Sequence, residues 1–267
     1  LGDVYKRQIL RYISNKNSIF APKTMQLFYN DSLYPQVQEV TFDKEESNHI
    51  HKVLRKKTGD LLFITDGRGY LYEAQIQYIT DKKCTAHILS HSLAPTPAYH
   101  LHIAVAPTKM NERYEWFLEK ATEIGVHEVT PILCDHSERK TIKTERFEKI
   151  LLSAMKQSLQ CYKPQLNPPI SLLEWLDTIE SNSVGKYVAH CQEGARVLLL
   201  DRLEELPQET TNLWVLIGPE GDFSQREIQK ACSKGFLPVS LSSNRLRTET
   251  AAIVACSCIS DIFQRKK

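Results

Sequence analysis

The sequence lacks the features of a membrane, secreted or metal-binding protein. It has no run of about 18 apolar residues, the length that a membrane-spanning helix needs. No charged start leads into an apolar stretch with a cleavage site. The seven cysteines form no CxxC pair and lie mostly in apolar stretches, so we expect buried free thiols in a reducing cytoplasm. The pairs His49/His51 and His100/His102 lack a third ligand at a fitting spacing, so we expect no metal.

A strongly basic composition, which would indicate nucleic-acid binding by the whole surface, is also missing. The chain of 267 residues has a formal net charge of +2. Residues 1–24 show no clear periodicity and precede Met25, and we interpret them as a leader or expression-derived segment. Because this segment carries +4, residues 25–267 carry −2. Any contact with nucleic acid therefore has to come from local basic patches.

Residues 25–95 have the pattern of a small β-rich, barrel-like domain. The segment 60–79 predicts a hairpin, because an apolar run and an Asp-Gly turn precede a strict alternation with Tyr72, Ala74, Ile76 and Tyr78 on one face. A further strand is expected at 84–89. The segment LAPTPA (93–98) contains two prolines and indicates a linker. We therefore expect a second domain over residues 96–267.

Strand and helix patterns alternate through this second domain. Such alternation predicts an α/β fold, with a parallel sheet covered on both faces. Ligand sites in these sheets lie beyond the carboxyl ends of the strands. The expected strands are 101–106, 127–134, 186–191, 213–218 and 236–241. The expected helices are 112–124 with Asn111 as its cap and Gly125 as its stop, 145–160, 225–234 and 248–263.

The segment LIGPEGDFSQREI (216–228) places a glycine-rich loop between an apolar strand and a helix. The two glycines let a ligand approach the backbone closely, and Pro219 stiffens the bend. Ser224 and Glu227 have the spacing of a capping box, and the helix start that they define favours an anionic group. On these grounds alone, the loop either binds a ligand or simply turns the chain.

The segment LSSNRLRTETA (241–251) repeats the order of strand, polar loop and helix. Arg245 and Arg247 stand just before the helix, where the helix dipole disfavours cations. Thr248 is a reasonable cap, and Glu249 in the first turn suits the dipole, so Glu249 has a stabilising as well as a functional interpretation. Arg247 has no such structural explanation and is the best candidate for a functional side chain.

Together these segments resemble the RsmE-type family of SPOUT methyltransferases, the 16S rRNA (uridine-N3) methyltransferases. The family pattern has LIGPEGG before a helix and then LG-x-x-x-LR-x-ETA. The segment EKATEIGVHEVTPILCDHSERK (119–140) is similar to a further family segment. The segments QLFYN (26–30) and HIHKVLRKKTGDLLFITDGRG (49–69) resemble the family's PUA-like RNA-binding domain. The resemblance extends over residues 25–267.

The resemblance implies a C-terminal SPOUT domain with a parallel sheet and a deep trefoil knot, and an N-terminal PUA-like β-barrel. It further implies a homodimer that binds S-adenosylmethionine and acts on 16S rRNA in the small ribosomal subunit. A compact bent cofactor held by backbone groups also fits the absence of a GxGxxG motif. Three loops would bind it, through His190, Leu216, Ile217, Gly218, Pro219, Glu220, Gly221, Leu241, Ser242, Asn244, Leu246 and Thr248.

Three places depart from the family pattern. Asp222 stands where the family usually has a second glycine. In the third loop, Ser242 replaces the usual glycine, and Asn244 stands where some members have arginine. The segment KQSLQ (156–160) lacks the arginine of the corresponding family segment, so its Lys156, or Lys163, is expected to supply the RNA or active-site contact.

Methylation of uridine at N3 requires loss of a proton and stabilisation of the resulting anion. Arg247 is the expected catalytic donor to a uracil carbonyl oxygen. Glu249 or Glu220 would position the base or balance the sulfonium charge. The segment HKVLRKK (51–57) would either grip RNA phosphates or form a solvated helix face. Its cations are Lys52, Arg55, Lys56 and Lys57.

Two alternatives stay open at this point. Another SPOUT enzyme, such as a ribose 2′-O-methyltransferase, shares a GPEG-like loop, although the segment LRTETAA (246–252) favours base methylation. The second alternative is a non-catalytic RNA-binding protein with a degenerate site.

Overall fold

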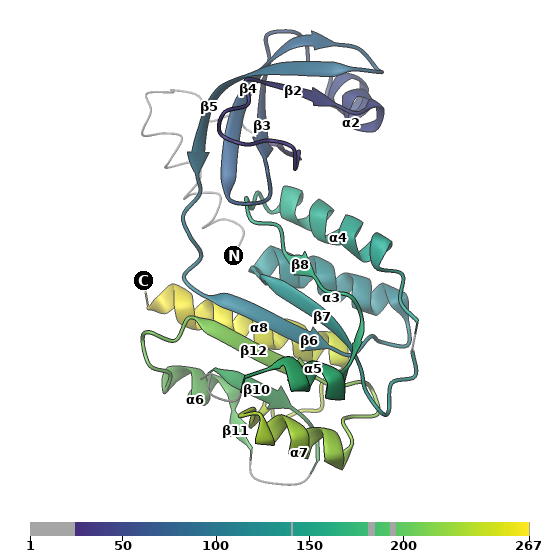
Figure 1. The fold of residues 1–267 in the computed structure, drawn as a ribbon, viewed down its shortest axis with the longest axis vertical. Helices are drawn as coiled ribbons and strands as arrows, with labels where there is room; N and C mark the ends of the chain where they lie inside the picture. The colour runs from purple at the N-terminus through teal and green to yellow at the C-terminus, as the bar shows by residue number, and fades with distance from the viewer. Residues whose placement is uncertain (1–24, 140, 181–184, 193–195, 267) are drawn as a thin grey trace. The chain divides into compact units, whose positions relative to one another are not determined.

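The computed structural model describes residues 25–139, 141–180, 185–192 and 196–266, so the predicted leader over 1–24 lies outside the described residues. The chain divides into two compact units (Figure 1). Of the described residues, the first unit contains Met25–Thr96 together with Met155–Lys163. The second contains Pro97–Ala154 and the chain from Pro164 onward. Nothing in the sequence pattern indicates that residues 155–163 group with the first unit.

The first unit is built on a curled five-stranded sheet with the strand order β1-β3-β4-β5-β2. The predicted hairpin is confirmed, because β3 and β4 pair antiparallel with Leu61 opposite Gln75. Strand β1 runs parallel to β3. The strands are β1 (Leu27–Tyr29), β2 (Glu39–Phe42), β3 (Leu61–Thr65), β4 (Tyr70–Ile79) and β5 (Cys84–Leu93).

A register shift in β4 alters the predicted alternation. Tyr72, Ala74 and Ile76 are buried in the core of the first unit, as the sequence predicts. Tyr78, predicted on the same face, is instead 53% exposed. The pairing of β4 with β5 shifts between Ile76 and Tyr78. Such a bulge disturbs the two-residue period, so the side chain after it turns to the other face.

Two short helices follow β2. Helix α2 (Lys44–Asn48) is capped by Asp43, whose carboxylate accepts a hydrogen bond from the Glu46 amide at 2.8 Å. The π-helix η1 (His49–Val53) contributes Ile50 to the core of the first unit. Arg55 then has a φ of 54°, in the left-handed region. The basic cluster is therefore not one helix face, because Lys52 lies on η1 and its other members follow the helix.

The second unit is built on a parallel sheet with the order β11-β13-β10-β12-β6-β7-β8, which confirms the predicted α/β class. Strand β9 pairs with β7 outside this order. The strands are β6 (His100–Val105), β7 (Glu128–Leu133), β8 (Gln165–Leu166), β9 (Ile170–Ser171), β10 (Lys186–Ala189), β11 (Val197–Leu198), β12 (Asn212–Ile217) and β13 (Leu237–Ser240).

Helices cover both faces of this sheet (Figure 1). Alternate residues of β6 point to opposite faces: Ile103 packs with one set of helices and Ala104 with the other. The first set comprises α3 (Asn111–Ile124), α4 (Thr144–Gln157), α6 (Leu199–Glu204) and α8 (Thr248–Arg265). The second set comprises α5 (Leu172–Thr178) and α7 (Gln225–Ser233).

The strand order brings the ends of three strands together. Strand β10 lies between β12 and β13 and pairs with both in parallel. The chain leaving β12 therefore passes β10 before it forms β13, and α8 then returns over β12 and β6. This crossing is the arrangement expected of the predicted knotted segment. It places the loops after β10, β12 and β13 side by side.

Two helices start one residue earlier than their predicted caps imply. Met110, not Asn111, is the N-cap of α3, and the Thr108 hydroxyl donates to the Met110 carbonyl at 2.7 Å. Arg247, not Thr248, is the N-cap of α8. Residue type favours Asn and Thr as caps, but the preceding loop decides where the extended backbone ends. The predicted stop at Gly125 is confirmed by its left-handed φ of 112°.

The seven cysteines are free thiols. Cys84, Cys134, Cys161 and Cys256 are buried as predicted, whereas Cys191 and Cys232 are exposed. Burial raises the pKa of Cys84 and Cys161 to about 11. Among the described helices, none combines the length and the apolar character that crossing a membrane requires.

Candidate functional site

A cavity of about 920 Å³ lies at the carboxyl ends of β10, β12 and β13. Its walls come from the three loops that follow these strands, and Ala251 of α8 adds to them. Parallel α/β sheets bind ligands at this edge, and the volume is within the range of small-molecule and cofactor sites. The cavity is therefore the first candidate for a ligand site.

Most residues predicted to bind the cofactor lie on the wall of this cavity. Leu216 and Gly221 are the two that do not. Leu216 is buried against α5 and α7, because alternate residues of β12 face opposite sides of the sheet. Gly221 is exposed, and a Cβ there would lie 3.0 Å from the Cβ of His136. The predicted residues on the wall are His190, Ile217, Gly218, Pro219, Glu220, Leu241, Ser242, Asn244, Leu246 and Thr248.

One hydrogen bond joins the second and third loops. The hydroxyl of Thr248, at the start of α8, donates to the Gly218 carbonyl at 3.1 Å. Gly218 also packs closely on Phe223, where an added Cβ would lie 3.1 Å from the ring. A side chain at residue 218 would therefore push the loop away from the buried Phe223. The two segments that the sequence singles out are parts of one structure.

The loop after β12 is held on its outer side as well. The backbone amide of Lys109 donates to the Glu220 carboxylate at 3.0 Å. The Nδ1 atom of His136 lies 3.1 Å from the Gly221 carbonyl and 3.0 Å from the Asp222 carbonyl. These contacts explain how a short loop with two glycines keeps one conformation. They also assign Glu220 a structural contact in addition to its place on the cavity wall.

Asp222 joins this loop to the loop after β10. Its carboxylate accepts a hydrogen bond from the Cys191 amide at 2.9 Å and another from the Phe223 amide at 2.9 Å. Its φ is 62°, in the left-handed region that Asp tolerates better than most side chains do. Sequence reasoning treats Asp222 only as a departure from the family pattern. The signal it offers is an acidic residue at a position that favours glycine.

The loop after β10 contributes His190 and Arg196. Both ring nitrogens of His190 are buried and have no hydrogen-bond partner among the described residues. Burial lowers the pKa of His190; the nearby Asp222 carboxylate opposes this shift, and Arg196 adds to it. His190 is therefore a neutral imidazole at neutral pH. Arg196 donates to the His190 carbonyl and lines the cavity, a role for which the sequence gives no motif.

The structure places the two predicted catalytic residues in different surroundings. Arg247 is exposed and lines the cavity. Glu249 is buried in the first turn of α8, outside the cavity wall, and one of its oxygens lies 3.8 Å from Nε of Arg113. Its other carboxylate oxygen has no hydrogen-bond partner in the part of the chain described. The geometry therefore supports contact of a ligand with Arg247 more directly than with Glu249.

The residues predicted to bind RNA belong to the first unit. Lys52, Arg55 and Lys57 are exposed, and Lys52 lies 3.7 Å from the Asp81 carboxylate. The Lys56 ammonium group donates to the Leu61 carbonyl at 3.2 Å. The three exposed cations lie within six residues, and Lys52 would have to exchange the Asp81 carboxylate for a phosphate.

The remaining two predicted RNA contacts are on the 155–163 segment. The Lys156 ammonium group lies 3.5 Å from the Glu46 carboxylate. The backbone amide of Lys163 donates to the Gly67 carbonyl at 2.8 Å. Both lysines are half-buried.

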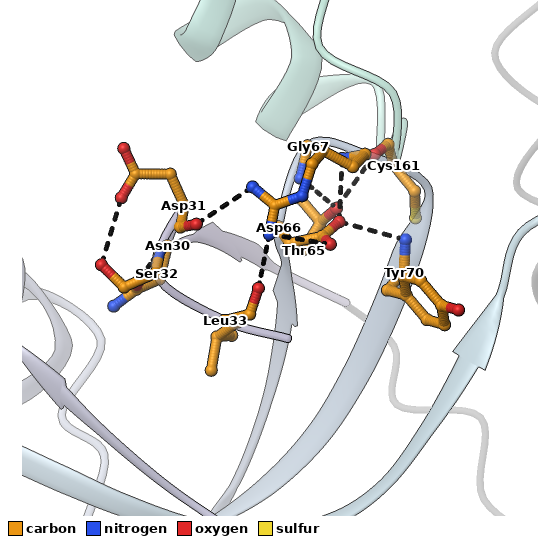
Figure 2. A network of polar contacts seen from close by, with 10 residues as sticks. Asn30, Asp31, Ser32, Leu33, Thr65, Asp66, Gly67, Tyr70 and Cys161 are labelled. Atoms are coloured by element: carbon orange, nitrogen blue, oxygen red, sulfur yellow. Dashed lines mark hydrogen bonds and ion pairs between the residues drawn. The ribbon is translucent and has the colours of Figure 1, made fainter. Parts of the chain in front are cut away.

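A polar network that sequence reasoning missed holds the turn of the β3–β4 hairpin (Figure 2). The carboxylate of Asp66 is buried and accepts the amides of Arg68 at 2.8 Å and Tyr70 at 3.1 Å. The Arg68 guanidinium donates to the carbonyls of Asp31 and Leu33. The Asp-Gly pair is the available signal, since Asp often accepts bonds from the backbone that follows it. The hydrogen bonds of this network give it a structural role, which is to hold the turn.

Metal binding has no support in the geometry of the described residues, where no three His, Cys, Asp or Glu side chains are grouped to hold an ion. The pair His100 and His102, for which the sequence predicts no metal, is an example. His102 is buried, and its Nε2 atom lies 2.7 Å from the Thr130 hydroxyl. Burial lowers the pKa of His102, and the Glu128 carboxylate, 3.4 Å from its Nδ1 atom, opposes this shift.

Comparison with known proteins now gives the class of this protein. Residues 94–260 match the family described as RNA methyltransferase domain, and residues 42–89 match the family described as RNA methyltransferase PUA domain. The first match spans more than half of the chain. The chain therefore belongs to the RNA methyltransferase family and carries that family's PUA domain.

Individual relatives agree with this assignment. A solved structure called "probable rRNA-methyltransferase", from Porphyromonas gingivalis, is 38% identical with a TM-score of 0.82, over 91% of this chain and 100% of that chain. Ribosomal RNA small subunit methyltransferase E of Buchnera aphidicola is 29% identical, over 90% of this chain and 94% of its own length. A methyltransferase of Legionella pneumophila, solved with S-adenosylmethionine as cofactor, is 26% identical with a TM-score of 0.78, over 89% of this chain and 98% of that chain.

Proposed function

We propose that this protein transfers the methyl group of S-adenosylmethionine to N3 of a uridine in small-subunit (16S) rRNA. The observation that carries the proposal is the cavity at the ends of β10, β12 and β13, whose walls include the two sequence segments that resemble the RsmE-type family. The relatives named Ribosomal RNA small subunit methyltransferase E support the same substrate class.

The residues of the cavity fit S-adenosylmethionine. The two buried ring nitrogens of His190, unpartnered among the described residues, are available to polar groups of a ligand. Helix α8 starts at the cavity, and no side chain of the described residues caps this start, which leaves its first backbone amides for a ligand. Gly218 and Pro219 form a wall without bulky side chains. When bound, the cofactor supplies an electrophilic methyl group on a sulfonium centre.

Arg247 is the residue that we propose to act on the substrate. Loss of the N3 proton leaves a negative charge that is shared with the uracil carbonyl oxygens. A guanidinium group at the cavity stabilises such a charge by donating hydrogen bonds to one of these oxygens. Arg247 is exposed and lies on the wall, so it is accessible to a base that enters from outside. Glu249 is proposed to hold the start of α8 through its contact with Arg113.

The test is nucleoside mass spectrometry of small-subunit rRNA after incubation with the protein and S-adenosylmethionine. The proposal expects 3-methyluridine to appear and to depend on both components. A 2′-O-methylated nucleoside would instead assign a ribose methyltransferase. Saturable binding of S-adenosylmethionine without any methylated nucleoside, on both free rRNA and assembled small subunits, would contradict the proposed activity.

We propose that the PUA-like part, residues 25–95, binds the RNA backbone through the exposed cations of the 52–57 cluster. Changing Lys52, Arg55 and Lys57 to Gln removes three exposed charges, so the slope of log affinity against log salt should fall by roughly 2–3. Filter binding at several salt concentrations measures this slope. An unchanged affinity and slope would show that the cluster faces solvent in the complex.

We also propose that the protein is a homodimer in the cytoplasm, as the family resemblance implies. Sedimentation equilibrium of the purified protein measures the oligomeric state, with an expected mass of about twice the 30.7 kDa of one chain. A monomer over the whole concentration range would remove the dimer from the proposal and leave the proposed chemistry untouched.

A further inference from the structure

Asp222 combines three properties that a simple turn residue does not need. It lines the cavity, its carboxylate is bonded to the loop after β10 through the Cys191 amide, and it occupies a left-handed conformation. Glycine satisfies the last property without strain, because it has no Cβ. An acidic side chain at this position therefore provides something beyond the turn, and its negative charge is the obvious difference.

The charge of Asp222 is not neutralised by an ion pair within the described part of the chain. Its two oxygens accept backbone amides, which stabilise the carboxylate but carry no net charge. The groups around it are His190, which is neutral, and the His136 ring at the Asp222 carbonyl. The cations on the same cavity wall are Arg196, Arg245 and Arg247. The second carboxylate on the wall, Glu220, is bonded to the Lys109 amide. The charge of Asp222 can therefore act on a ligand inside the cavity.

We propose that Asp222 makes the cavity prefer the cationic methyl donor over its neutral demethylated product. This inference rests on the proposed function and adds a specificity-determining residue to it. Transfer of the methyl group turns the sulfonium of S-adenosylmethionine into the thioether of S-adenosylhomocysteine, and the ligand loses one positive charge. A carboxylate at the wall stabilises the first ligand and not the second, so the spent cofactor leaves and fresh donor replaces it.

The dimensions of the cavity give the size of the effect. A sphere of the cavity volume is about 12 Å across, so a charge on the ligand lies within about that distance of a carboxylate on the wall. At an effective dielectric constant of about 40, Coulomb's law gives a preference of roughly three-fold or more for S-adenosylmethionine over S-adenosylhomocysteine. Salt screens this interaction, because the Debye length at about 0.15 M is about 8 Å. The preference should therefore weaken as ionic strength rises.

Isothermal titration calorimetry with both ligands tests the inference. Asp222→Asn removes the charge, keeps the size of the side chain and tolerates the left-handed backbone. Its single amide oxygen can accept only one of the two backbone hydrogen bonds that the carboxylate accepts. The ratio of the affinities for S-adenosylmethionine and S-adenosylhomocysteine should fall about three-fold, because only the first ligand carries the additional positive charge. The control is Asp177→Asn on α5, which removes an equal charge from an exposed ion pair with Lys230 of α7 and should leave the ratio unchanged.

A second variant protects the test against a folding defect. Asp222→Gly suits the φ of 62° and removes both hydrogen bonds, so both ligands should bind more weakly, with the same fall in their ratio as in the Asn variant. If both variants keep the wild-type ratio of the two affinities, Asp222 only holds two loops together, and the inference is overturned. Failure of the wild-type protein to bind either ligand would instead overturn the proposed function, so the two failures are distinguishable.

Discussion

The two helices that follow the loops after β12 and β13 start in opposite ways. Helix α7 begins with a capping box, in which the Glu227 carboxylate accepts the Ser224 amide at 2.7 Å and, further, the Asp135 amide at 2.9 Å. Helix α8 begins at Arg247 with no side-chain cap, and Arg245 stands two residues before it. The start of α7 has its hydrogen bonds within the protein. The start of α8 presents cations and free amides to the cavity.

The contrast between the two helix starts indicates that one contributes to stability and the other to function. A missing cap costs about 1 kcal/mol, and a cation near a helix N-terminus costs roughly 0.3–1 kcal/mol. Sequences keep such local costs mainly where a functional residue requires them. We therefore expect changes at the start of α7 to lower stability, and changes at the start of α8 to lower activity or ligand binding.

The largest effect is expected at Arg247. Arg247→Ala should lower the turnover of rRNA methylation by roughly 10²–10³-fold, because a donor to the developing charge is lost. The calorimetric affinity for S-adenosylmethionine should change little, and so should the melting temperature. Near-wild-type turnover in this variant would contradict the proposed role of Arg247. It would also contradict the expectation that changes at the start of α8 lower activity.

The largest change in stability is expected at Glu227. Glu227→Ala leaves the amides of Ser224 and Asp135 without acceptors in a buried place, so it should lower the free energy of unfolding by about 2–3 kcal/mol. Urea unfolding followed by circular dichroism measures this difference. Gln229→Ala, an exposed position on the same helix, is the matched control and should change stability very little. Equal stabilities of the two variants would contradict the capping interpretation.

Thr248 tests the link between the two segments. Thr248→Val removes the hydroxyl that donates to Gly218, which should destabilise the protein by about 1 kcal/mol and weaken binding of S-adenosylmethionine. Thr248→Ser keeps the hydroxyl and should bind the cofactor like the wild type. If the Val and Ser variants bind equally well, the bond does not hold the cavity wall in place.

The smallest effect is expected at Asp135, beside the start of α7. Hydrogen bonds from Arg226 and Ser224 lower the pKa of Asp135 to about 2, below the value of about 3.9 in an unfolded chain. A lowered pKa stabilises the fold above pH 4, and this contribution is lost as the pH falls towards 2. Because the pair is largely exposed, Asp135→Asn should cost less than about 1 kcal/mol at pH 7.

Urea unfolding of both proteins at pH 7, 4 and 3 checks this prediction. The difference in stability between wild type and Asp135→Asn should shrink with each step, since the carboxylate becomes protonated. A difference that grows as the pH falls would contradict the assigned pKa shift.

Local patterns predicted much of the fold, and the failures have physical causes. The hairpin at 60–79, the stop at Gly125 and the capping box of α7 depend on neighbouring residues, which a sequence displays directly. The exposure of Tyr78 depends on a bulge against β5, and the start of α3 depends on the bond from Thr108 to Met110. Pairing between strands decides the exposure of Tyr78, and the conformation of the preceding loop decides where α3 starts.

The candidate site divides in the same way. Family motifs predicted the glycine-rich loop and the Arg247 segment, because each is continuous in the sequence. The contacts that hold the site together join distant residues, such as Thr248 with Gly218 and Asp222 with Cys191. Arg196 lines the cavity from a segment without a motif. Only the crossing of the chain over the sheet brings these residues together.

The bond between Thr248 and Gly218 also sets when a newly made chain becomes competent. The cavity walls run from Ala189 to Ala251, and Thr248 closes them from a position 30 residues after its partner. Domains fold largely as units while the ribosome makes the chain from its N-terminus. A nascent chain that ends before α8 has the strands of the site but no closed cavity. We therefore expect chains that end before α8 to lack a closed binding site for the methyl donor.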